Sequence, residues 1–78
     1  MILQKIEDIL IENFPDSDVN ISNDFFEDGI IDSFGMVSLI LALEKEFNIS
    51  IPGQKVVKEN FSNTKAIEDL IMSLRNEV

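Results

Sequence analysis

The sequence predicts a small all-α fold: a bundle of three main helices and one short helix, with a long loop between the first and second helices. Two observations favour this fold class. Apolar residues recur at helical spacing in three segments, and no segment alternates apolar and polar residues as a half-buried strand does. The chain has 78 residues, 45% of them hydrophobic, which suffices for one modest core. We therefore expect residues 1–78 to form a single domain.

The first predicted helix begins near Ile2 and ends near Asn13. Pro15 ends it, because the residue before a proline is pushed out of the helical region. Its apolar face is expected to contain Ile2, Leu3, Ile6, Ile9, Leu10 and Phe14.

Residues 15–32 show no sustained period and are predicted to form a long loop. Loops of this length are uncommon in compact domains and are often functional. This one is unusually apolar, and we expect its large side chains to pack onto the core. They are Val19, Ile21, Phe25, Phe26, Ile30 and Ile31.

The second predicted helix is the clearest of the three. It begins at Asp32 or Ser33, which are both good N-cap residue types, and runs to about Asn48 with Gly35 as a weak helix former. At 100° per residue, its apolar residues form two stripes. The expected core stripe contains Met36, Leu39, Ile40, Leu43 and Phe47. The second stripe contains Phe34, Val37 and Leu41.

A short extended link and strong turn residues, Pro52 and Gly53, follow this helix. Residues 54–60 are predicted to add a turn or two of helix. Ser62 or Asn63 then caps a last helix that is expected to run to Arg75. The apolar side of this helix contains Ala66, Ile67, Leu70, Ile71 and Leu74.

The residue types that the chain lacks exclude several functions. It has no Cys and no His, so disulfide frameworks, Cys-based zinc sites and Ser–His catalysis are impossible. The acid-rich stretch that starts at Asp24 fails the EF-hand spacing, because the third position is Phe26 and the twelfth is Gly35. We expect neither a catalytic site nor a metal site.

The charge is strongly negative, net −9, and nine of the 15 acidic residues lie in residues 1–32 with only Lys5 as a basic neighbour. Such a field repels nucleic acid and anionic lipid. The longest apolar run, residues 39–43, is too short to span a bilayer. We expect a soluble cytoplasmic monomer without nucleic-acid binding or direct membrane insertion.

Ser33 is the candidate site residue. Taken alone, a serine at the start of a helix is most simply a cap. It cannot act as a catalytic nucleophile, because no His exists and no Lys lies nearby in sequence to take its proton. As an acceptor of a phosphoryl group it is well placed, since the N–H groups and dipole of a helix N-terminus favour phosphate.

Three segments resemble acyl carrier proteins at family spacing: FEDGIIDSFGMVSL at 26–39, ALEKEF at 42–47 and ISIP at 49–52. The resemblance covers essentially the whole chain. It implies that Ser33, preceded by Asp32, receives 4′-phosphopantetheine from coenzyme A through a Mg²⁺-dependent phosphopantetheinyl transferase. The thiol of this arm then carries an acyl or aminoacyl group as a thioester. A loading ligase and a downstream acceptor enzyme are the further partners implied, and the carrier itself catalyses no step.

The subtype is less sharply defined. Fatty-acid carriers usually show acidic residues in the turn after the serine, where this chain has Gly35 and Ser38. Phe34 and Gly35, with residues 26–29, look more like D-alanyl carrier proteins, which deliver D-alanine for cell-envelope teichoic acid. That group often has Trp where this chain has Phe61. A peptidyl or specialised acyl carrier, as in fatty-acid or polyketide biosynthesis, stays open, and so does an unmodified acidic interaction module.

The second stripe of the second helix is the expected partner surface. Phe34, Val37 and Leu41 would form its apolar centre beside the arm, with Glu44 as a charged neighbour. The alternative is that these residues pack beneath the loop at 15–32.

Overall fold

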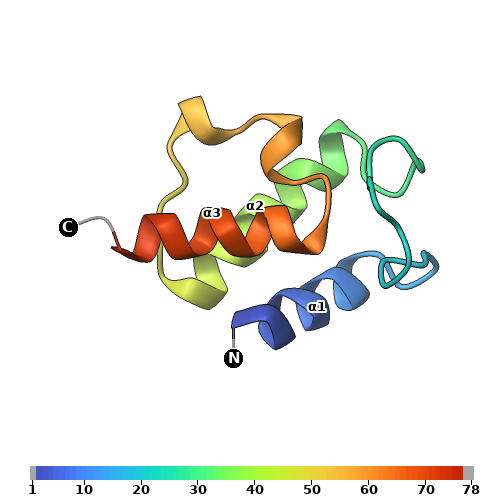
Figure 1. Ribbon diagram of the computed structural model, residues 1–78, viewed down its shortest axis with the longest axis horizontal. Helices are drawn as coiled ribbons and strands as arrows, with labels where there is room; N and C mark the ends of the chain where they lie inside the picture. The colour runs from blue at the N-terminus through green and yellow to red at the C-terminus, as the bar shows by residue number, and fades with distance from the viewer. Residues whose placement is uncertain (1, 77–78) are drawn as a thin grey trace.

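The computed structural model describes residues 2–76, which form three α-helices: α1 (Ile2–Asn13), α2 (Ser33–Phe47) and α3 (Thr64–Asn76). Helix α1 packs against both α2 and α3, and the long loop lies at the end of the bundle where α2 begins (Figure 1). This part of the chain contains no strand, so the all-α prediction is confirmed. None of its helices is long and apolar enough to cross a membrane.

The predicted short fourth helix consists of two 3₁₀ turns, η1 (Gly53–Lys55) and η2 (Lys58–Asn60). Val57 separates them with an extended backbone, φ −131° and ψ 152°. A β-branched side chain is comfortable in that conformation and lowers helix propensity. The segment therefore links α2 to α3 without forming a continuous helix.

One hydrophobic core holds the molecule together. Both Phe25 of the loop and Phe61 after η2 are fully buried in it. On α2, Leu39 and Leu43 are fully buried, whereas Met36, Ile40 and Phe47 pack against the core with part of their surface exposed. The core residues are Ile6, Leu10, Val19, Phe25, Ile31, Leu39, Leu43, Ile51, Phe61, Ile67, Leu70 and Ile71.

The loop between α1 and α2 packs onto this core, with one exception. Ile21 was expected to be buried, yet its side chain is 77% exposed. It lies in a tight turn in which the backbone N–H groups of Ile21 and Ser22 both donate to the Asp18 carbonyl. In this turn Val19 faces the core, and Ile21 is left to solvent.

Hydrogen bonds fix the part of the loop that leads into α2. The Asp24 Oδ1 atom accepts from the N–H groups of Phe26 and Glu27 at 3.0 and 3.1 Å. Phe25 donates its N–H to the Ser62 carbonyl at 2.6 Å. Gly29 has φ +74°, a conformation that favours glycine. The backbone that precedes Ser33 is therefore tied both to itself and to the start of α3.

Candidate functional site

Ser33 is the first residue of α2, and its side chain is exposed. Asp32 is the N-cap residue: its Oδ1 atom accepts from the Gly35 N–H at 2.8 Å, and its carbonyl accepts from the Met36 N–H at 2.8 Å. Of the two N-cap candidates that the sequence offered, Asp32 and Ser33, Asp32 is the one that caps the helix. Because Asp32 makes the cap, the Ser33 hydroxyl is not needed for it.

Gly35, in the first turn of α2, lies in close contact with Phe14. A Cβ atom at position 35 would lie 3.0 Å from Cε1 of Phe14 and 3.3 Å from Oδ1 of Asp32. The absence of a side chain thus lets the Phe14 ring pack directly against the turn that carries Ser33. Sequence reasoning treated Gly35 only as a weak helix former. A glycine in the first turn of a helix can indicate that another group approaches closely, and the structure identifies that group as the Phe14 ring.

The second stripe of α2 lies in solvent. Phe34, Val37 and Leu41 are 85%, 56% and 61% exposed. The alternative that they pack beneath the loop is wrong, and their predicted exposure is confirmed. Three large apolar side chains on one helix face next to an exposed serine form a surface suited to binding another protein.

Glu44 lies on the same side of α2 as Ser33, since eleven residues correspond to almost a whole number of turns and to about 16 Å of rise. Its Oε2 atom accepts from the Ile51 N–H at 2.8 Å. Its carbonyl accepts from the N–H of Asn48, the left-handed residue with φ 53° that ends the helix. Glu44 therefore fastens the segment after α2, a structural role that sequence reasoning missed.

The end of the molecule that carries Ser33 is negative. Residues 16–32 contain six acidic residues and no basic one. One cation beside this segment is Lys58, whose Nζ atom lies 5.7 Å from the centre of the Phe26 ring. On α3, hydrogen bonding to Asp69 at 3.0 Å and then to Glu68 raises the pKa of Lys65. The uncompensated acidic field favours partners with basic surfaces.

Residues 2–76 place no group of three or more His, Cys, Asp or Glu side chains where they could hold a metal ion. The chemistry available at the site is that of one exposed hydroxyl at a helix N-terminus. The first N–H groups of a helix lack intrahelical partners and favour a phosphate group, so the residues fit a phosphate-linked arm. The fold and the site together define a small helical domain that exposes one serine at a helix N-terminus.

The family described as the phosphopantetheine attachment site matches residues 2–71, and the chain belongs to this family. Its cofactor is therefore 4′-phosphopantetheine, bound covalently. The resemblance to acyl carrier proteins is confirmed.

Several relatives are named as carrier proteins, and the matches to this chain cover most of their length. The D-alanyl carrier protein of Bacillus licheniformis is 39% identical over 69 residues, which cover 88% of this chain and 80% of the relative. The D-alanyl carrier protein of Streptococcus mutans is 31% identical over 75 residues, 96% of this chain and 91% of the relative. Aminoacyl carrier protein 2 of Bradyrhizobium diazoefficiens is 32% identical over 72 residues, 92% of this chain and 80% of the relative.

Proposed function

We propose that this carrier holds D-alanine as a thioester on a 4′-phosphopantetheine arm attached to the Ser33 hydroxyl. The observation that supports the attachment point is the exposed first residue of α2, freed from the capping role by Asp32. The names of the relatives from Bacillus and Streptococcus support D-alanine as the cargo. The chain acts as a substrate of its partner enzymes and contributes no catalytic group.

Attachment requires Ser33 to supply only its hydroxyl oxygen. The Oγ atom forms a new P–O bond to the phosphorus next to pantetheine, the P–O bond to the rest of coenzyme A breaks, and adenosine 3′,5′-bisphosphate leaves. The proton of the hydroxyl passes to a general base of the transferase. The N–H groups and dipole of the first turn of α2 stabilise the phosphodiester. When bound, the arm supplies the thiol that carries the cargo.

The exposed stripe of Phe34, Val37 and Leu41 is the proposed docking surface for three kinds of enzyme: the phosphopantetheinyl transferase, the loading ligase and the acceptor enzyme. An apolar centre beside acidic residues combines burial on binding with electrostatic steering. The Glu44 carboxylate contributes negative charge on the same side, in addition to its bond to Ile51. The monomeric state and the cytoplasmic location stay predictions.

A second cargo is supported by the relative from Bradyrhizobium, whose name specifies an aminoacyl group in general. Both cargoes share one chemistry, an α-ammonium group on a thioester. Incubation of the modified chain with its loading ligase, ATP and single amino acids separates them. D-alanine should load the largest fraction of the chain, seen as the share of the protein mass shifted by one alanyl group, and preferential loading of another amino acid would assign the second cargo.

The attachment itself is tested by intact mass. After incubation with coenzyme A, Mg²⁺ and a broad-specificity transferase, the native chain should gain one phosphopantetheine and Ser33→Ala should gain none. Ser38→Ala is the matched control, since Ser38 is also an exposed serine of α2, and it should be modified like the native chain. An increment that persists in Ser33→Ala would contradict the attachment point. A native chain that gains nothing would favour the unmodified interaction module.

A further inference from the structure

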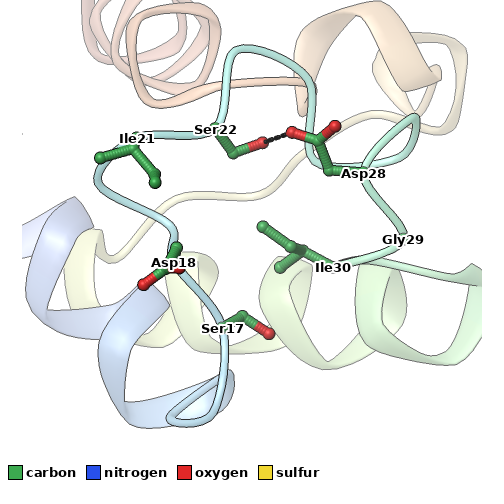
Figure 2. A pocket seen from close by; sticks show the side chains of 7 residues that line it. All are labelled: Ser17, Asp18, Ile21, Ser22, Asp28, Gly29 and Ile30. Atoms are coloured by element: carbon green, nitrogen blue, oxygen red, sulfur yellow. Dashed lines mark hydrogen bonds between the residues drawn. The ribbon is translucent and has the colours of Figure 1, made fainter.

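The loop between α1 and α2 encloses a cleft of about 430 Å³ beside the attachment end of α2. Figure 2 shows the seven residues that line it, and they come from both ends of the loop. They are Ser17, Asp18, Ile21, Ser22, Asp28, Gly29 and Ile30. Its lining includes no fully buried core residue and no residue of the exposed stripe of α2.

The walls of the cleft combine an apolar surface with carboxylates. Ile30 is half-buried and its side chain points into the hollow (Figure 2), while Ile21 stands 77% exposed at the rim. Asp18 and Asp28 add two exposed carboxylates. The Ser22 hydroxyl donates to Oδ2 of Asp28 at 2.6 Å, which joins the two sides of the loop across the cleft.

The cleft lies within reach of an arm on Ser33. Ile30 precedes Ser33 by three residues, so their Cα atoms are at most about 11 Å apart. An extended phosphopantetheine arm is longer than this span. A tethered group also has an effective concentration in the millimolar range, so that even a weak contact becomes populated.

We propose that this cleft receives the aminoacyl end of the loaded arm. The ammonium group of the cargo faces Asp18 and Asp28, and the apolar part of the arm packs against Ile21 and Ile30. Charge complementarity supports this placement, because an aminoacyl thioester carries a positive charge near neutral pH, whereas a simple acyl cargo is neutral. The proposal rests on the proposed function, and it gives the carrier its own preference for aminoacyl over acyl cargo.

The test compares two hydrolysis-stable arms that differ in one group. Each joins the cargo to the arm through an amide, and one ends in D-alanyl and the other in D-lactyl, in which a neutral hydroxyl replaces the ammonium. Both are installed on the ¹⁵N-labelled chain by the transferase and compared by amide chemical shifts at pH about 6.5, where the α-amino group is protonated. The difference between the two spectra should concentrate on residues 17–22 and 28–30.

Three variants connect the shifts to the carboxylates. Asp18→Asn and Asp28→Asn should each reduce the difference at the cleft by about half, because the Coulomb energies of the two carboxylates add. Asp16→Asn is the matched control, since Asp16 is exposed on the same loop but does not line the cleft, and it should leave the difference unchanged.

Equal spectra for the two arms would overturn the proposal. So would shift differences that lie along α2, or differences at the cleft that stay the same in Asp18→Asn and Asp28→Asn. Shifts at the cleft that emerge only when a partner enzyme is added would also overturn the proposal, because they would show that the enzyme and not the cargo contacts the cleft. Failure of the proposed function is a separate result, because it shows earlier as a chain whose mass does not increase with the transferase.

Discussion

The two apolar stripes of α2 contain similar residues in opposite environments. Leu43 is fully buried, whereas Leu41, two residues earlier, is 61% exposed. A domain of this size needs nearly every apolar residue in its core for a small surplus of stability. The exposure of Phe34, Val37 and Leu41 beside an exposed serine therefore supports the proposal that this stripe binds partner enzymes. Periodicity in the sequence thus locates an apolar face, but only the burial seen in the structure shows whether that face stabilises the fold.

The largest effect on stability is expected on the buried stripe. Leu43→Ala removes a fully buried side chain and should cost about 2 to 5 kcal/mol, through lost burial and the cavity left behind. Leu41→Ala, the same change on the exposed stripe, is the matched control and should cost less than about 0.5 kcal/mol. Urea denaturation of both variants measures the contrast. Equal costs would mean that the two stripes are not distinct.

The first turn of α2 offers a second contrast, between Asp32 and Ser33. Asp32→Ala removes the cap that accepts from the Gly35 N–H and should cost about 0.5 to 2 kcal/mol. Ser33→Ala should cost less than about 0.5 kcal/mol, because its hydroxyl does not make the cap. Thermal denaturation distinguishes them. A larger loss of stability in Ser33→Ala than in Asp32→Ala would show that the serine, and not the aspartate, stabilises the start of the helix.

Gly35 lies between the exposed stripe and the core, and its contact with Phe14 is the next feature to test. Gly35→Ala should cost about 1 kcal/mol. The crowded ring costs about 1 to 3 kcal/mol, and the gain of up to about 1 kcal/mol in helix propensity offsets part of it. In a Phe14→Leu background, the alanine should become neutral or stabilising. A Gly35→Ala chain as stable as the native one would show that the ring moves aside freely.

The smallest effect on stability, with a large effect on function, is expected on the exposed stripe. Leu41→Ser should leave the thermal midpoint within a few degrees of the native value, since about 1 kcal/mol shifts a domain of this size by roughly 4 to 8 °C. It should nevertheless lower kcat/KM for loading by the ligase at least about fivefold, as loss of a buried interface residue costs more than about 1 kcal/mol. Loading at the native rate would remove the stripe from the proposed docking surface.

The helices of this fold were predictable because each one carries its own period and its own ending signals. Asn63, one of two expected caps for α3, does accept the Ala66 N–H at 2.8 Å. Asp32 and Ser33 could not be ranked from sequence, since both residue types cap helices and only the backbone geometry decides between them.

The loop and its packing onto the core were predictable, but its conformation was not, because distant groups hold it. The N–H of Phe25 bonds to the Ser62 carbonyl, and Asn63 bonds to the Asn23 carbonyl at 3.4 Å. No local pattern reports such contacts. For the same reason, the exposure of Ile21, the cleft beside it and the bond from Ile51 to Glu44 emerged only from the structure.

We propose that the exposed hydroxyl of Ser33, and no other group of the chain, bears the phosphopantetheine arm. Fragmentation mass spectrometry of the modified chain tests this attachment point, because it locates the added mass on one residue and needs no substitution. Every fragment with the increment should contain Ser33, while fragments that contain Ser38 but lack Ser33 should be unmodified. An increment on Ser38, on Ser22 or on any other residue would contradict it.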